Sequence, residues 1–233
     1  MAQDDPYGMA RSSHEPAADL SPLAAQVITM LCERQTVSAA GARQIAVDYL
    51  VRATVASGAF DPVRVLDELR GFRLTLDAVI DLYIPQAAER LGEMCLCSDM
   101  DFSGVTIGAL RLQALLAEAS LGLSRVGPVL DDALHALVVV HEGEQHFLGA
   151  SVVAAQLRRL GCEVSLSINE NSRQIVSRVV CDQPDMVLLS CSRIGVLETA
   201  TRTVKKIRSS ADPAPVIALG GPIRGNAAGI RDK

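Results

Sequence analysis

Apolar residues follow two different patterns along the chain, and the pattern changes near Gly127-Pro128. From about residue 20 to residue 127 they recur every three or four positions, which is typical of helices with one buried face. After that point, short runs rich in Val, Ile and Leu alternate with segments of helical spacing. We therefore expect a helical bundle over residues 20–127 and a domain of alternating strands and helices over residues 132–233. Residues 1–19 are polar and aperiodic, which predicts a disordered tail.

The first part is expected to contain five helices joined by short connections, as in a helical bundle. Most of them begin at a Ser, Thr or Asp that can cap a helix, in two cases followed by Pro. The expected starts are Ser21-Pro22, about Ser38, Asp61-Pro62, either Thr75 or Asp77, and either Asp101 or Ser103. The fourth helix contains Pro85, which predicts a kink because proline has no N–H to donate.

The second part contains four apolar runs that predict strands buried on both faces. These runs lie in residues 134–140, 162–168, 185–191 and 215–221, and they are separated by helical segments in residues 147–161, 171–183 and 195–210. This α/β alternation predicts a doubly wound, Rossmann-like parallel sheet, in which ligands bind beyond the carboxyl ends of the strands. Twelve residues follow Gly221, too few for another strand and helix. The pattern leaves open whether the sheet is small or the chain has lost its end.

Composition excludes several classes of protein. A net charge of -5, the absence of Trp and an aromatic content of 3% argue against a strong nucleic-acid binder. No apolar run approaches the ~20 residues that span a bilayer, and the acidic N-terminus lacks the apolar core of a secretory signal. We therefore expect a cytoplasmic protein without a membrane segment. Six cysteines show no disulfide spacing, and Cys95-x-Cys97 alone is a weak zinc signal.

The loop after the first predicted strand concentrates chemically active side chains. It holds His141, Glu142, Glu144 and His146, although the whole chain has only 4 histidines. No glycine-rich dinucleotide motif follows this strand, and no phosphate-binding loop motif occurs elsewhere. A nicotinamide, flavin or ATP site therefore has no motif to support it.

The stretch Glu144-Gln145-His146-Phe147-Leu148-Gly149 resembles the D/E-x-H-x-x-G element of the cobalamin-binding domain family. Two further elements match that family in order: Ser190 at the end of the third strand, and Gly220-Gly221 after the fourth. The resemblance spans roughly residues 134–221, and the preceding bundle resembles the family's helical cap. A histidine beside a glutamate is usually only a solvated pair, so the hypothesis depends on the three elements together.

The resemblance implies a role for each matching residue. His146 would be the lower axial ligand of cobalt, and Glu144 would accept the other ring N–H and so fix the imidazole tautomer. Gly149 would leave space for the nucleotide tail, and Ser190 would hydrogen-bond that tail. Gly220 and Gly221 would let the tail lie close to the backbone. The implied cofactor is adenosylcobalamin or hydroxocobalamin. His141 matches no element, and we expect a structural or gating role, with axial ligation as a lesser alternative.

The bundle carries a second resemblance. Residues 102–106, continuing to Arg111-Leu112-Gln113, resemble the cap helix of the AerR/PpaA-type antirepressors of photosynthetic bacteria. That family implies a light-responsive corrinoid protein that binds a DNA-bound transcriptional repressor of photosynthesis genes. It also implies no direct contact with DNA and no catalysis, which agrees with the absence of a nucleophile and base at convincing spacing.

Met94, Cys95 and Phe102 are candidates for the surface above the corrinoid, with ordinary bundle core as an equal alternative. Related light sensors often carry Trp after an L-G-x-x pattern, where this chain has Leu91-Gly92-Glu93-Met94 and then Cys95. A smaller thiol changes the space for the upper ligand. Three other functions stay open: a corrinoid subunit of a methyltransferase system, a haem or tetrapyrrole sensor using His146 or His141, and an interaction module without a corrinoid.

Overall fold

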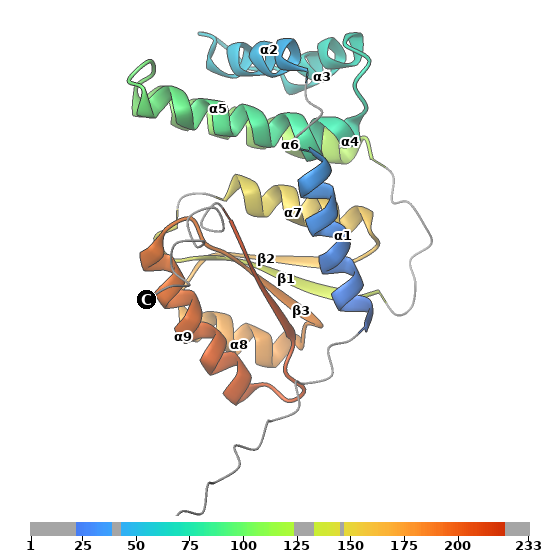
Figure 1. Ribbon diagram of the computed structural model, residues 1–233, viewed down its shortest axis with the longest axis vertical. Coiled ribbons are helices and arrows are strands. Elements are labelled where there is room, and N and C mark those ends of the chain that lie inside the picture. The colour runs from blue at the N-terminus through green and yellow to red at the C-terminus, as the bar shows by residue number, and fades with distance from the viewer. Residues whose placement is uncertain (1–21, 39–42, 124–132, 145–146, 222–233) are drawn as a thin grey trace, which may run out of the picture.

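The computed structural model describes residues 22–38, 43–123, 133–144 and 147–221 (Figure 1). A group of N-terminal helices precedes a parallel sheet of four strands, and along the chain these strands alternate with three helices. Across the sheet the strand order is β2-β1-β3-β4. This arrangement confirms the expected fold class. None of the helices within the described ranges is both long enough and apolar enough to cross a bilayer. The predicted tail, residues 1–19, lies outside the described residues.

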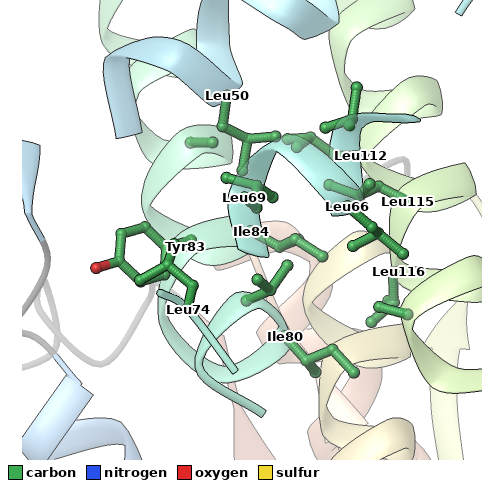
Figure 2. Close-up of a cluster of buried hydrophobic side chains, with 14 of the residues drawn as sticks. Leu50, Leu66, Leu69, Leu74, Ile80, Tyr83, Ile84, Leu112, Leu115 and Leu116 are labelled. Atoms are coloured by element: carbon green, nitrogen blue, oxygen red, sulfur yellow. The ribbon is translucent and has the colours of Figure 1, made fainter. Parts of the chain in front are cut away.

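The helical bundle is built around a leucine-rich core (Figure 2). Its main helices are α2 (Gln44–Val55), α3 (Pro62–Gly71), α5 (Ile84–Leu96) and α6 (Phe102–Leu121). The largest fully buried side chains include Leu50, Leu69, Ile80, Ile84, Leu91, Leu112 and Leu115. Burying one such side chain stabilises a fold by about 1.5–3 kcal/mol, so the apolar spacing seen in the sequence is sufficient to hold these helices together.

Side-chain caps mark where three helices of the bundle begin. Helix α2 begins instead after Arg43, which makes no side-chain cap, and the start expected near Ser38 was wrong, since α1 ends there. The Asp61 carboxylate accepts the N–H groups of Val63 and Arg64 at 3.0 and 3.2 Å. Thr75, and not Asp77, caps α4 (Leu76–Ala78) through the Ala78 N–H. Asp101, and not Ser103, caps α6. Each cap satisfies N–H groups that the first helical turn leaves unpaired.

The predicted fourth helix is divided into three segments. A short π-helical segment, η1 (Val79–Tyr83), separates α4 from α5, which has Pro85 in its first turn. The Ile84 N–H donates to the Val79 carbonyl five residues earlier. Because Pro85 has no N–H, the regular hydrogen bond of the next turn cannot form, and the wider π turn accommodates this loss. The irregularity expected at Pro85 therefore lies in the turn before it.

The strands line up their carboxyl ends at one edge of the sheet. They are β1 (His135–His141), β2 (Glu163–Glu170), β3 (Met186–Ser190) and β4 (Val216–Gly220). Val140 is in register with Ser190, and Ser190 is in register with Gly220. The segments that resemble the cobalamin-binding family are therefore brought together at this edge by parallel pairing.

Helices cover both faces of the sheet. On one face, α7 (Leu148–Arg159) packs with the side chains of Val138 and Val140. On the opposite face, α8 (Ser172–Asp182) and α9 (Ile194–Ser210) pack in a cluster with Leu137 and Val139. Successive side chains of β1 alternate between these faces, and both are apolar, which explains the uninterrupted apolar run in the sequence.

Helix α1 (Pro22–Ser38) packs on the sheet as well as beside the bundle. Its buried residues Ala24, Val27 and Leu31 belong to the cluster that contains β1 and α7, and α1 also contacts β4 and η1. The expected bundle of residues 20–127 included this helix, whereas its apolar stripe is buried against the other domain. Local periodicity shows that a helix has one apolar face, but not which surface that face meets.

Candidate functional site

The loop that follows β1 is anchored at its start by a tight turn. The Glu144 N–H donates to the His141 carbonyl at 3.0 Å, and Gly143 adopts a φ of 77°, a conformation that favours glycine. His146 lies outside the described residues, as does Gln145. The chain resumes at Phe147, just before α7 begins.

Glu144 is a buried carboxylate that points to the end of the neighbouring strand. Only 6% of the residue is exposed. Its Oε2 accepts the backbone N–H of Ser192 at 3.2 Å and the Ser192 hydroxyl in a short hydrogen bond. Hydrogen bonds to an ionised carboxylate are stronger than neutral ones, so Ser192 fixes where this oxygen lies. Burial, together with the negative charge of Glu144, raises the pKa of the adjacent Cys191 thiol.

Two further residues brace the same loop from the strands on either side. The Gly143 N–H donates to the Asn169 side chain of β2 at 3.4 Å. The Gly143 carbonyl accepts a hydrogen bond from the Arg193 guanidinium, just after β3, at 2.8 Å. The described start of the loop, at Gly143, is therefore held by protein contacts on both sides. Asn169, Ser192 and Arg193 were not singled out in the sequence, because no local pattern marks them as partners of this loop.

The three glycines of the motif differ in the space around them. Among the described residues, a side-chain methyl at Gly149 or at Gly220 would meet no heavy atom within 4 Å. Gly221, in contrast, has a φ of +116°, and a methyl there would overlap the Cys191 carbonyl. Glycine at position 221 is required by the fold itself. At Gly149 and Gly220 the described residues give no steric reason for glycine.

Ser190 and His141 lie at the carboxyl edge of the sheet in different environments. Ser190 is half-buried and lies between Val140 and Gly220 in register. His141 is 1% exposed, and neither ring nitrogen has a hydrogen-bond partner within the described residues. Burial lowers the pKa of His141, so the neutral imidazole is favoured.

The candidate residues of the cap lie at the end of the α5–α6 hairpin. Met94 is half-buried and packs on the bundle core, Cys95 is half-buried at the end of α5, and Phe102 is 70% exposed in the first turn of α6. Packing in the bundle core therefore explains part of the apolar character of Met94, whereas it does not explain the exposed aromatic ring of Phe102. In Figure 1 this hairpin end projects past the start of α7, on the side where the strands end.

The side of helix α6 that carries Phe102 also carries Gln113, which contacts the sheet domain. Thr106, Leu110 and Gln113 follow Phe102 at helical spacing, and the Gln113 side chain donates to the Ser151 hydroxyl of α7 at 3.0 Å. The stripe that carries Phe102 therefore turns toward α7. Leu110 is 56% exposed. Thr106 and Leu110 were not singled out in the sequence, because a helix has several stripes and the spacing does not show which one faces the neighbouring domain.

No group of three or more His, Cys, Asp or Glu side chains capable of holding a metal ion occurs in the described part of the chain. Cys95 and Cys97 are free thiols there.

Residues 134–229 match the B12 binding domain family. The chain is 28% identical over 157 residues to an uncharacterised 20.5 kDa protein of Rhodobacter capsulatus from the bchF-crtJ intergenic region, covering 67% of this chain and 82% of that protein. Among solved structures it resembles the monomethylamine corrinoid protein of Methanosarcina barkeri, with a TM-score of 0.61 and 13% identity. That match covers 76% of this chain and 82% of the other. The segment that matches the B12 binding domain is thus preceded by a group of helices.

Proposed function

We propose that this protein binds cobalamin at the carboxyl edge of its sheet and regulates transcription through another protein. The observation that carries the corrinoid part is the Glu144 loop. A buried carboxylate, fixed by Ser192, lies two residues before His146 within the segment that matches the B12 binding domain. The regulatory part of the proposal is supported by the resemblance of the cap to the antirepressor family. The fold alone does not support a regulatory role.

The residues at the site fit a corrinoid. The open space at Gly149 and Gly220 suits a nucleotide tail that passes over the start of α7 and the end of β4. Ser190 is half-buried at the end of β3, in register with Val140 of β1 and Gly220 of β4. Its hydroxyl would donate to the tail there.

His146 would supply the axial nitrogen, and Glu144 would accept the opposite ring N–H. A carboxylate in this position fixes the tautomer and raises the basicity of the ligating nitrogen. Ser192 and the turn at Gly143 act before binding, because they hold Glu144 in one place and reduce the ordering that the ligand must impose. His141 stays neutral behind the loop and has a structural role in this proposal.

The cap would sense the upper face of the corrinoid. A bound alkylcobalamin supplies a cobalt–carbon bond that light can break. Phe102, Thr106 and Leu110 form the surface that would contact the alkyl group and exclude water around it. Met94 and Cys95 border this surface at the end of α5. A ligand that contacts this stripe in one cap arrangement and not in another shifts the balance between them, and the exposed surface changes accordingly.

The partner in this proposal is a DNA-bound repressor of photosynthesis genes, and the protein itself catalyses no reaction and does not contact DNA. The Rhodobacter capsulatus relative supports the combination of cap and B12 binding domain, since its 157 matched residues exceed the B12 binding segment alone.

The decisive experiment is a set of absorbance spectra of the purified protein after gel filtration with hydroxocobalamin or adenosylcobalamin, in darkness and after illumination. His146→Ala is the test variant. His135→Ala is a matched control, because His135 lies at the opposite end of β1 and hydrogen-bonds Ser165 at 3.1 Å.

We expect wild type and His135→Ala to retain the corrinoid with the same spectrum, and His146→Ala to lose it or to show an altered spectrum. A spectral change on illumination and light-dependent binding of the repressor would support the regulatory part. A protein that retains no corrinoid in any form contradicts the corrinoid proposal. Equal repressor binding by the apo, dark and illuminated forms contradicts the regulatory part alone.

A second candidate is a methyl carrier in a methyltransferase system. It is favoured by the fold similarity to the monomethylamine corrinoid protein of Methanosarcina barkeri, at a TM-score of 0.61. Rapid methylation of the bound corrinoid by a methyl donor and partner enzyme, without a response to light, would favour this function over regulation.

A further inference from the structure

Helix α7 is buried on two sides and belongs to both domains. Ala150, Ala154 and Leu157 pack in the cluster of the sheet and α1. Val152 and Ala155 pack in the core cluster of the bundle. Small residues on both sides allow the sheet and the cap to approach the same helix closely. A displacement of α7 cannot occur without repacking one of the two domains, since packed interiors leave little free volume.

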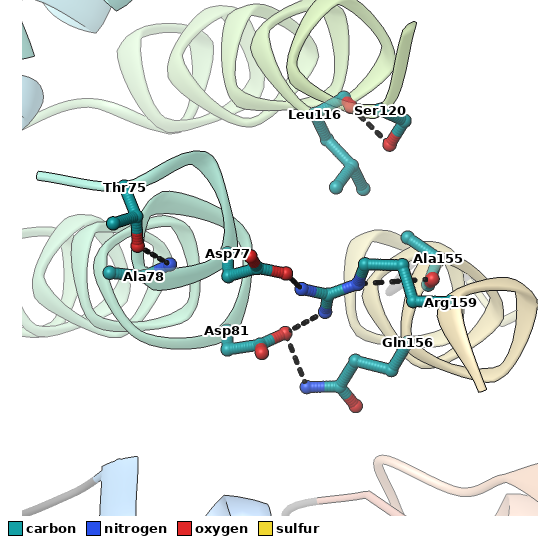
Figure 3. A network of polar contacts seen from close by, with 9 residues as sticks. All are labelled: Thr75, Asp77, Ala78, Asp81, Leu116, Ser120, Ala155, Gln156 and Arg159. Carbon is teal, nitrogen blue, oxygen red and sulfur yellow. Dashed lines mark hydrogen bonds and ion pairs between the residues drawn. The ribbon is translucent and has the colours of Figure 1, made fainter. Parts of the chain in front are cut away.

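Polar side chains at the far end of α7 tie it to the cap (Figure 3). Four residues form what we call the interdomain polar cluster: Asp77, Asp81, Gln156 and Arg159. The Arg159 guanidinium makes short ion pairs with Asp77 of α4 and Asp81 of η1. The Gln156 amide donates to Asp81 at 3.0 Å.

The interdomain polar cluster is largely removed from solvent. The side chains of Arg159 and Asp81 are only 8% and 15% exposed, whereas Asp77 is 59% exposed. The Arg159 Nε also donates to the Ala155 carbonyl of its own helix at 3.4 Å, so the guanidinium is oriented from α7. Buried charged side chains attract one another strongly only in a well-defined geometry. If one partner moves away, the other is left as a buried charge without compensation.

The cap side of the interdomain polar cluster is an irregular helix. Asp81 is the central residue of the π-helical segment η1, and π segments inside α-helices often occur at functional sites. Ile80, beside it, is fully buried in the bundle core. A movement of Asp81 is therefore transmitted directly to the core of the cap.

The opposite end of α7 continues from the Glu144 loop. Leu148, the first residue of α7, lies two positions after His146, and the Ser151 N–H donates to the Phe147 carbonyl. Eleven residues separate Leu148 from Arg159, which corresponds to about 16 Å of helix at 1.5 Å per residue. One rigid helix thus joins the loop of the proposed axial ligand to the cap at a point remote from it.

We propose that α7 and the interdomain polar cluster couple the state of the corrinoid loop to the packing of the cap. This inference rests on the proposed corrinoid site and adds the route by which occupancy of that site reaches α2, α3 and η1, which do not border the loop. The interdomain polar cluster acts through α7 and does not touch the ligand.

The test is hydrogen–deuterium exchange of the full chain, apo and loaded with hydroxocobalamin, in wild type, Asp81→Asn and Arg159→Gln. Corrinoid retention is measured by absorbance in the same samples. Arg90→Gln is the matched control, because it removes an exposed ion pair with Glu93 at 2.9 Å on the cap surface. Asp77→Asn is a milder variant of the same cluster, should the others fail to fold.

In wild type and Arg90→Gln, loading should slow the exchange of amides in α2, α3 and η1 by at least about fivefold, the lower end of typical coupling between sites. In the interdomain polar cluster variants the corrinoid should still bind, with slower exchange confined to the loop, the start of α7 and the part of α6 that carries Phe102 and Thr106. Undiminished slowing in α2 and α3 of these variants overturns the inference while leaving the proposed site intact. Failure of every form to retain a corrinoid refutes the proposed function, and this inference with it.

Discussion

Replacing Gly149 by Ala should separate the needs of the fold from those of a ligand. Gly149 is the second residue of α7, and a methyl group there would meet nothing within 4 Å. Alanine in a helix is more stable than glycine by roughly 0.5–1 kcal/mol, because glycine loses more backbone entropy on folding. Near the helix start we expect the lower value, about 0.5 kcal/mol, which corresponds to a rise in Tm of about 1–2 °C for a chain of this size.

The same methyl group should weaken corrinoid binding. In the proposed site the nucleotide tail passes over Gly149, so the added carbon takes space that the ligand needs. We expect hydroxocobalamin to bind at least about tenfold more weakly, a loss of about 1.4 kcal/mol. Urea denaturation of the apo protein and a spectroscopic titration with hydroxocobalamin measure the two effects separately.

Gly221→Ala provides the contrast. Its φ of +116° and the overlap with the Cys191 carbonyl should destabilise the apo protein by about 2–6 kcal/mol, from backbone strain and overpacking together. The reasoning about Gly149 is refuted if Gly149→Ala binds the corrinoid as tightly as wild type. A loss of apo stability in Gly149→Ala would show instead that this glycine serves the fold.

Three further changes test other parts of the molecule. Burial lowers the pKa of His141, so the folded apo protein should lose stability as the pH falls below about 6.5, the unfolded value. The contribution of His141 to stability should be constant above that pH, and denaturation of His141→Leu should show a weaker dependence on pH below it. Leu112→Ala should lower the free energy of unfolding by about 2–5 kcal/mol, because Leu112 is fully buried in the cap core, and an unchanged denaturation midpoint would contradict this. Ser192→Ala should remove a charge-assisted hydrogen bond worth about 1.5–3 kcal/mol from Glu144, measured by denaturation, and should alter the spectrum of the bound corrinoid. A spectrum identical to wild type would mean that Ser192 does not position the axial ligand.

Features with local causes could be predicted from the sequence. The apolar runs of β1 and β3 predicted strands buried on both faces, which the clusters on the two faces of the sheet confirm. The N-caps at Asp61 and Asp101 follow from side chains that bond to N–H groups two or three residues away. The positions of Ser190 and Gly220 at the same edge as the Glu144 loop follow from parallel pairing, once the strands are recognised. The roles of these residues toward a ligand stay predictions.

Other features depend on contacts between distant segments, and only the tertiary structure decided them. Ser192 holds Glu144 across 48 residues, and Arg159 reaches Asp77 across 82. The apolar stripe of α1 fits a sheet face as well as a bundle, and the sequence carries no signal of which one it covers. The periodicity of a sequence shows which side of each helix or strand is apolar, because that side depends only on the geometry of the helix or strand itself. Which surfaces then meet depends on the packing of the whole chain, and so do the partners of Glu144 and Arg159.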